Sequence, residues 1–187
     1  RSPESREIYN NLINYKITGK LKYLEAATTP KEEAYSLLGL KDQEVYVDAG
    51  AYDGDTIREF CAHMELLGHS YKKIYAIEPD PKNFRKLETH VKGSGLRAVE
   101  LIQAALSNQN GFMTFDDKAG RSSSLSPTGR RQVLVNRLDD LINEPGTLLK
   151  MDVEGAEREA LDGCQRILKE HRPRLIISAY HRSGDLM

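Results

Sequence analysis

The feature that most restricts the fold is a repeated alternation of short apolar segments and amphipathic segments between residues 45 and 178. The apolar segments are rich in Val, Ile and Leu and too short for helices, which is typical of buried strands. Most of the segments between them carry apolar residues at helical spacing. The predicted strands span residues 45–47, 74–77, 98–103, 112–115, 132–136, 148–151 and 175–178, and the alternation in 132–136 predicts an edge strand. The predicted helices span residues 55–67, 138–142 and 156–170, and another begins at Pro81 after an Asp80 cap. Strands joined by helical crossovers pair in parallel, so the sequence predicts an α/β fold with a doubly wound, mostly parallel sheet covered on both faces.

The beginning of the chain lacks this alternation and is helical in pattern. Apolar side chains recur at helical spacing between residues 8 and 17. Thr29, which precedes a proline, is typical of a helix N-cap, and Gly39 is typical of a helix end. We therefore expect a helical N-terminal extension over residues 1–42 and one domain over residues 43–187.

Composition narrows the class of protein. Charged residues make up 29% of the chain, hydrophobic residues make up 39%, and the net charge is −1, as in ordinary globular proteins. Near-neutrality does not favour nucleic acid as a partner, because binding a polyanion needs an excess of Lys and Arg. No apolar run approaches the ~20 residues of a membrane span. Cys61 and Cys164 lie among apolar positions of predicted helices, so we expect two reduced thiols and a cytoplasmic protein.

Polar residues follow five of the predicted strands at the point where each strand ends. In chain order they are Asp48, Glu78, Gln103, Asp152 and the pair Tyr180 and His181. In doubly wound sheets, ligands bind beyond the carboxyl ends of the strands. Five polar strand ends therefore predict one binding site along a single edge of the sheet.

The segment 48–56 is the first candidate ligand-binding loop. Gly50 and Gly54 permit a close approach of the backbone to a ligand, but the three glycines of a dinucleotide loop are not present. The carboxylates of the segment belong to Asp48, Asp53 and Asp55. Such charges beside a diphosphate cost several kcal/mol, whereas a sulfonium and an ammonium group fit them, which predicts S-adenosylmethionine as the ligand. The last two carboxylates could instead cap the following helix, but capping leaves Asp48 unexplained.

Glu78 follows the second predicted strand. A carboxylate at this place accepts hydrogen bonds from ribose hydroxyls, which is how nucleoside cofactors are held in this fold class. An acidic residue after a strand is a weak signal by itself. Together with the glycine loop it predicts a nucleoside cofactor.

Five motifs carry a resemblance to a known family. They are residues 48–56 (Asp-Ala-Gly-Ala-x-x-Gly-Asp-Thr), 78–84 (Glu-Pro-Asp-Pro-x-Asn-Phe), 104–107 (Ala-Ala-Leu-Ser), 137–140 (Arg-Leu-Asp-Asp) and 150–157 (Lys-Met-Asp-Val-Glu-Gly-Ala-Glu). In order and spacing these motifs resemble those of the FkbM-type methyltransferases, over residues 44–185. The resemblance implies a Rossmann-like fold, S-adenosylmethionine as the methyl donor, and transfer usually to a hydroxyl oxygen of a sugar, a glycan or a polyketide-like product.

The resemblance also implies where the donor binds. The loop after the first strand holds its methionine half, Glu78 holds the ribose, and the end of the third strand lies near the adenine. The predicted donor-binding residues are Asp48, Gly50, Ala51, Tyr52, Asp53, Gly54, Thr56, Glu78, Pro79, Asn83, Gln103, Ala104 and Ala105. The sequence departs from the family at Tyr180 and His181, where an acidic residue is common. Because the class has further strands beyond Met187, we expect the domain to be truncated there.

Asp152, Glu154 and His181 are the predicted catalytic residues, since they follow neighbouring strands on the edge that faces the donor. Transfer to a hydroxyl oxygen requires removal of a proton, and an imidazole is a natural general base near neutral pH. Together with Glu157, the same three residues could hold a divalent cation. Helical spacing argues against all four converging, so no metal site is predicted. Lys150 lies inside a predicted strand and is expected to pair with a carboxylate.

The polar segment 116–131 is the longest predicted loop. It carries Arg121, Arg130 and Arg131 among small polar residues. Such a loop can close over an acceptor, an anionic one included, or remain solvated.

Other functions stay open besides a small-molecule or glycan O-methyltransferase. One is a methyltransferase that acts on nitrogen or on a macromolecule, although no Asn/Asp-Pro-Pro-Tyr run follows the strand 148–151. Another is a nicotinamide oxidoreductase or a catalytically silent nucleotide-binding module. The sequence does not indicate the oligomeric state.

Overall fold

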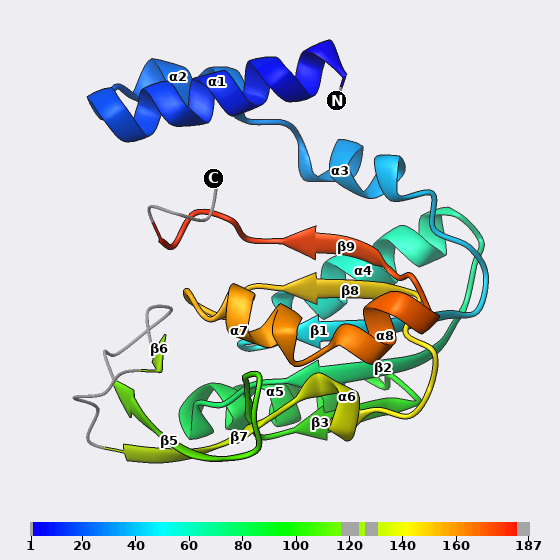
Figure 1. Cartoon of the computed structure of the whole chain (residues 1–187). Coiled ribbons are helices and arrows are strands. Elements are labelled where there is room, and N and C mark those ends of the chain that lie inside the picture. The colour runs from blue at the N-terminus through cyan, green and yellow to red at the C-terminus, as the bar shows by residue number, and fades with distance from the viewer. Residues whose placement is uncertain (1, 117–123, 126–130, 183–187) are drawn as a thin grey trace. The chain divides into compact units, whose positions relative to one another are not determined.

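The computed structural model describes residues 2–116, 124–125 and 131–182 (Figure 1). The chain separates into two compact units, Arg1–Leu40 and Lys41–Met187. The boundary between the two units lies after Leu40, whereas the sequence pattern predicted it after residue 42. Most of the predicted polar loop lies outside the described residues.

The first unit is helical. Its helices are α1 (Pro3–Thr18), α2 (Leu21–Ala27) and α3 (Lys31–Leu38). The hydroxyl of Ser2 caps α1 by accepting a hydrogen bond from the backbone N–H of Ser5 at 3.2 Å. The predicted cap of α3 at Thr29 is wrong, because the N-cap residue is Pro30, which offers no side-chain acceptor. Gly39 ends α3 as predicted, in the left-handed conformation with φ of 56°.

A parallel five-stranded sheet forms the centre of the second unit, with the strand order β3-β2-β1-β8-β9. The bounds of its strands are β1 (Glu44–Ala49), β2 (Tyr71–Ile77), β3 (Val99–Ile102), β8 (Leu148–Met151) and β9 (Arg174–Ile177). Every residue of β1 is buried, as expected for the middle strand of a sheet covered on both faces. The predicted α/β class with a mostly parallel sheet is confirmed.

Helices cover both faces of this sheet. Their bounds are α4 (Asp55–Leu66), α5 (Pro81–Ser94), α6 (Leu138–Leu141), α7 (Glu157–Asp162) and α8 (Gln165–Glu170). The crossovers through α4 and α5 step from β1 toward β3, and the crossover through α7 and α8 steps the opposite way, from β8 to β9. Right-handed crossovers in opposite directions lie on opposite faces, and Figure 1 shows α4 behind the sheet with α7 and α8 in front of it.

A second, smaller sheet was not predicted. It has the order β4-β7-β5-β6 and is made of β4 (Ala105–Leu106), β5 (Gly111–Asp116), β6 (Ser124–Leu125) and β7 (Arg131–Asn136). The prediction that residues 132–136 form an edge strand is wrong, because β7 pairs with β4 on one side and with β5 on the other. Val133 and Val135 are buried while Leu134 is exposed. This alternation indicates which face is covered, and it carries no information about which strands lie alongside.

The single helix predicted over residues 156–170 is in fact two. A side chain from α6 causes the break, because the buried carboxylate of Asp139 accepts hydrogen bonds from the backbone N–H groups of Arg166 at 2.8 Å and Ile167 at 3.0 Å. Asp139 thereby caps α8 from outside its own segment. At the break, a Cβ on Gly163 would lie 2.0 Å from the carbonyl oxygen of Ser107, so only glycine fits there.

Candidate active site

The five polar strand ends lie along one edge of the central sheet. The five strands are parallel and adjacent, so their carboxyl ends meet at the same edge. Asp48 lies inside β1 near its end, and Glu78 and Gln103 directly follow β2 and β3. Asp152 directly follows β8, and His181 comes a few residues after β9. Beyond this edge lie the loop that follows β1 and the loop that follows β8.

Residues 50–54, which we term the β1 loop, require glycine at two positions. Gly50 has φ of 82°, and a Cβ there would lie 1.9 Å from the carbonyl oxygen of Asp152. Gly54 has φ of 89°, and a Cβ there would lie 2.8 Å from Cδ2 of His90. The loop therefore packs against the backbone that follows β8 at Gly50 and against the side chain of His90 on α5 at Gly54.

Asp48 anchors the β1 loop from beneath. Its carboxylate is 0% exposed, accepts a hydrogen bond from the hydroxyl of Thr56, and forms an ion pair with Nζ of Lys150 at 3.1 Å. The same Nζ donates to the carbonyl oxygen of Gly50 at 2.8 Å. The expected pairing of Lys150 with a carboxylate is confirmed. Because its charge is neutralised inside the protein, Asp48 shapes the loop rather than presenting a free charge to a ligand.

Glu78 is the buried carboxyl group that contacts the β1 loop from the end of β2. It is 6% exposed, and its oxygens accept hydrogen bonds from the backbone N–H groups of Tyr52 at 3.0 Å and Asp80 at 2.9 Å. Burial, with a smaller contribution from the charge of Asp80, raises the pKa of Glu78 to about 7. Each carboxylate oxygen has a second lone pair, so both can still accept a hydrogen bond from a ligand.

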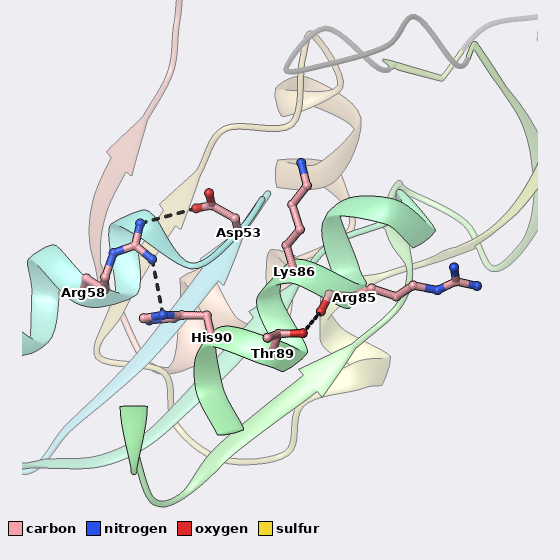
Figure 2. A pocket seen from close by; sticks show the side chains of 6 residues that line it. All are labelled: Asp53, Arg58, Arg85, Lys86, Thr89 and His90. Carbon is pink, nitrogen blue, oxygen red and sulfur yellow. Dashed lines mark hydrogen bonds and ion pairs between the residues drawn. The ribbon is translucent and has the colours of Figure 1, made fainter. Parts of the chain in front are cut away.

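The two remaining carboxylates of the first motif are engaged at the start of α4. Asp53 accepts from the backbone N–H of Asp55 at 3.2 Å, and Asp55 accepts from that of Thr56 at 2.9 Å. Asp53 also lies 3.5 Å from the guanidinium group of Arg58. Figure 2 shows this guanidinium group between Asp53 and the ring of His90, and its contact with Nδ1 of the ring is 3.3 Å. Both carboxylates therefore stabilise the start of the helix.

A hollow beside the β1 loop is rich in basic groups. It is lined by Asp53, Arg58, Arg85, Lys86, Thr89 and His90 (Figure 2). Lys86 also lies over the ring of Tyr52, with Nζ 5.2 Å from the ring centroid. This contact connects α5 to the β1 loop.

The other residues that are predicted to contact the methyl donor differ in how exposed they are. Gln103 is exposed and Pro79 is half-buried, so both side chains can reach a ligand. Asn83, on α5, is buried. Three of the predicted residues are buried alanines, namely Ala51, Ala104 and Ala105. The last of them belongs to β4 of the second sheet.

Four charged side chains meet at the ends of β8 and β9, and we term them the histidine cluster: Asp152, Glu154, Glu157 and His181. Nδ1 of His181 lies 3.0 Å from Oε1 of Glu157. Nε2 of the same ring lies 3.3 Å from Oε2 of Glu154 and 3.5 Å from Oδ1 of Asp152. The three predicted catalytic residues are thus in mutual contact through one imidazole.

Glu157 is the member of the cluster that the catalytic prediction missed. It is 6% exposed, and its Oε1 accepts from the backbone N–H groups of Val153 at 3.0 Å and Gly155 at 3.3 Å. It therefore orders the loop after β8, in which Glu154 and Gly155 both have positive φ, of 53° and 94°. Helical spacing was expected to keep Glu157 apart from the other three residues, and that expectation is wrong, because all four side chains meet at His181. The convergence with His181 depends on the end of β9, which is distant in sequence.

The domain pattern known as the Methyltransferase FkbM domain matches residues 48–186. The chain belongs to the FkbM methyltransferase family. The predicted family is therefore confirmed. The match contains both the β1 loop and the histidine cluster, so both lie within the part of the chain that defines the family.

The solved structure of a methyltransferase FkbM from Methylobacillus flagellatus KT is similar over the whole chain. The TM-score is 0.81 and the sequence identity 26%, and the match covers 100% of this chain and 47% of the other. This chain thus spans about half the length of that FkbM methyltransferase. No curated protein matches the chain significantly.

Two further solved structures are less similar. One is a precorrin-6y C5,15-methyltransferase from Geobacter metallireducens GS-15, with 21% identity, coverage of 76% of this chain and 57% of the other, and a TM-score of 0.48. The other is a SAM-dependent methyltransferase from Aquifex aeolicus, with 16% identity, coverage of 82% and 66%, and a TM-score of 0.45.

Within the described part of the chain, no helix is both long enough and apolar enough to cross a bilayer.

Proposed function

We propose that this protein is an S-adenosylmethionine-dependent methyltransferase that transfers the methyl group to a hydroxyl oxygen of a small molecule, a sugar or a glycan. The observation that carries the proposal is that a glycine loop, a buried acid and the histidine cluster share one sheet edge. Residues 48–186, which match the FkbM domain, contain all three. Alignment of the donor with an acceptor at that edge is the main task of such an enzyme.

The donor side is proposed to be the β1 loop with its flanking residues. Glu78 accepts hydrogen bonds from the ribose hydroxyls, since its oxygens retain lone pairs and its backbone partners hold it in place. The half-buried Pro79 and the exposed Gln103 are proposed to lie near the adenine. Asp48 acts indirectly, through its hydrogen bond with Thr56 and its ion pair with Lys150.

The acceptor side is proposed to be the histidine cluster. Asp152, Glu154 and His181 form the group that removes the proton of the acceptor hydroxyl as the methyl group arrives. This group adjoins the β1 loop, because Gly50 packs against the backbone of Asp152. His181 contacts all three carboxylates, so its loss is expected to impair the whole group.

A methyltransferase acting on nitrogen or on a macromolecule is the principal alternative, and a silent nucleotide-binding module is the other. A proton-removing group is needed for a neutral hydroxyl, and the histidine cluster supplies one, which favours the hydroxyl acceptor.

A cytoplasmic location is also part of the proposal. Cys61 and Cys164 are free thiols, which is usual in a reducing compartment. Burial raises the pKa of these thiols to about 11 and about 12, which keeps them in the unreactive protonated form.

Calorimetry with S-adenosylhomocysteine, S-adenosylmethionine and NAD tests the donor. We expect binding of the two methionine derivatives, no binding of NAD, and at least about tenfold weaker binding in Glu78→Ala.

Transfer of a labelled methyl group to a panel of hydroxylated glycans and small molecules tests the acceptor. With an acceptor in hand, we expect His181→Ala to lower turnover.

The matched control for His181→Ala is His63→Ala. His63 lies in the last turn of α4, and this helix returns from the carboxyl edge, so that turn lies at the opposite edge of the sheet. Unchanged turnover in His181→Ala would remove the catalytic role of the cluster. Binding of NAD in place of the methyl donor would refute the proposed function as a whole.

A further inference from the structure

Three buried polar atoms without a hydrogen bond lie together in the histidine cluster. Among the residues that the structure describes, Oδ1 of Asp152, Oε2 of Glu157 and Nδ1 of His181 are all buried and accept or donate no hydrogen bond. Folded proteins satisfy about 90% or more of their buried polar groups, and an ion is one of the explanations for an exception. Three exceptions in one place indicate a shared missing partner.

The geometry of the closest contact is that of neighbouring ligands. Nδ1 of His181 lies 3.0 Å from Oε1 of Glu157 without being aligned as its hydrogen-bond donor, and the oxygen without a partner is Oε2 of the same carboxylate. Two ligands at right angles on an ion, each ~2.1 Å away from it, are themselves ~3.0 Å apart.

The third ligand lies within reach of the same point. One ligand atom each from Asp152, Glu157 and His181 lie within 4.8 Å of one another. Ligands on opposite sides of a divalent ion are separated by about 4 to 5 Å. The three side chains can therefore surround one ion with small movements.

The charges of the cluster also call for a cation. Two carboxylates and a neutral imidazole carry a charge of −2, which a divalent ion balances, and Glu154 adds a further negative charge at 3.3 Å from the ring. Each ring nitrogen of His181 has a carboxylate oxygen within 3.3 Å. Whichever nitrogen does not bind the ion thus has a carboxylate beside it, and such carboxylates orient metal-binding histidines in other proteins.

We propose that Asp152, Glu157 and His181 bind a divalent cation. A set of one imidazole nitrogen and two carboxylate oxygens suits a first-row ion such as Mn²⁺ or Zn²⁺ better than Ca²⁺, which takes oxygen ligands alone. Three protein ligands leave open positions on the ion.

The meaning of this ion for catalysis rests on the proposed function. The site adjoins the β1 loop through Gly50 and Asp152, where an ion can polarise the acceptor hydroxyl. His181 is then a ligand, and Glu154 is the carboxylate of the cluster that is left to receive the proton. The rival explanation is a protonated His181 that holds the carboxylates together without any ion.

The test is Mn²⁺ binding to the whole chain after treatment with EDTA, followed by electron paramagnetic resonance and calorimetry. We expect one Mn²⁺ ion per chain, and at least tenfold weaker binding in His181→Ala and in Glu157→Gln. Glu170→Gln is the matched control, because Glu170 is an exposed residue of α8 whose ion-pair partner, among the described residues, is Arg166. Its Mn²⁺ affinity is expected to equal that of the unaltered chain.

Glu157 also orders the loop after β8, so a Glu157→Gln chain that fails to fold is replaced in the test by Asp152→Asn, which alters the same site beside His181→Ala. An absence of stoichiometric Mn²⁺ binding, or equal binding in the unaltered chain and these variants, overturns the metal site and favours the protonated imidazole. Calorimetry with S-adenosylhomocysteine on the same samples separates the two proposals. Donor binding without Mn²⁺ binding refutes the ion alone, and Mn²⁺ binding without donor binding supports the ion while it refutes the proposed function.

Discussion

The β1 loop and the histidine cluster both place carboxylates at the same sheet edge, but they treat the charge differently. Beneath the β1 loop, Asp48 has a lysine and a hydroxyl as partners, and Glu78 has two backbone N–H groups. In the histidine cluster, three carboxylates share one imidazole. In the first region each buried carboxylate has separate partners within the chain, whereas in the second the carboxylates outnumber the one imidazole that they contact. We therefore expect the chain alone to hold the first region in place, and the second to be stabilised by the proposed cation.

The largest expected effect is on stability, through the ion pair between Asp48 and Lys150 beneath the β1 loop. Lys150→Met leaves Asp48, which is 0% exposed, without its counter-charge. Removal of one partner of a buried ion pair costs about 3–5 kcal/mol. We expect a loss of this size in the free energy of unfolding, measured by denaturant titration. Lys169→Met, on the last turn of α8, is the control and should change it by less than about 0.5 kcal/mol.

The double variant Lys150→Met, Asp48→Asn sharpens the same test. Once the carboxylate is gone, most of the loss should be recovered, because the cost comes from an uncompensated charge. A loss below about 1 kcal/mol in Lys150→Met alone would show that Asp48 is not held by Lys150.

The next largest effect is expected where the two regions touch. Gly50→Ala combines a φ of 82° with a Cβ 1.9 Å from the carbonyl oxygen of Asp152. The left-handed conformation alone costs about 1–2 kcal/mol for alanine, and the clash adds to it. Thermal unfolding should show a total destabilisation of at least about 2 kcal/mol.

Gly93→Ala is the control for this variant. Gly93 lies inside α5, and a Cβ there meets no atom within 4 Å. Alanine should stabilise this position by about 0.5–1 kcal/mol. Equal stability of Gly50→Ala and the unaltered chain would mean that the β1 loop does not pack against the backbone after β8.

A smaller effect, on donor affinity, is expected from the titration of Glu78. Its pKa of about 7 lies above the ordinary value for a glutamic acid. The group is therefore mostly protonated at pH 6 and mostly ionised at pH 8, and ribose hydroxyls donate more strongly to the ionised form. The affinity for S-adenosylhomocysteine should rise with pH over this range, by up to about tenfold.

The dependence on pH should be absent in Glu78→Gln. Glu88→Gln, which changes a residue of α5 that pairs with Lys92, should keep it. A pH-independent affinity in the unaltered chain would contradict the proposed contact between Glu78 and the ribose.

The smallest effect is expected when the histidine cluster is altered and the donor side is measured. His181→Ala should change the affinity for S-adenosylhomocysteine by less than about twofold, or ~0.4 kcal/mol. The reason is that, within the described part of the chain, the interactions of His181 are with other members of the cluster and with Tyr180. A large loss of affinity for S-adenosylhomocysteine in calorimetry would show that the histidine cluster is part of the donor-binding site.

Most of the central sheet and part of the site could be predicted because their signals are local. The apolar segments that become β1, β2 and β8 bury most or all of their residues, so they are visible as continuous runs. Asp80 followed by Pro81 specifies the start of α5, and the cap hydrogen bonds to Lys82 and Asn83 are present. The polar strand ends follow from the same local patterns.

Contacts between distant segments could not be predicted. The cap on α8 comes from Asp139, more than twenty residues earlier in the chain, so a continuous helical pattern hides the break. The pairing of β7 with β4 and β5 depends on which neighbours are available, and alternation along one strand does not reveal them.

The sequence by itself determined the α/β class, the glycine loop and the acidic strand ends, because backbone conformation and burial leave periodic marks on neighbouring residues. Only the tertiary structure decided which charges neutralise each other. Lys150 reaches Asp48 across adjacent strands, and Glu157 reaches His181 across the end of the sheet. An electrostatic interaction depends on distance in space and on burial, and neither quantity can be deduced from the order of the residues.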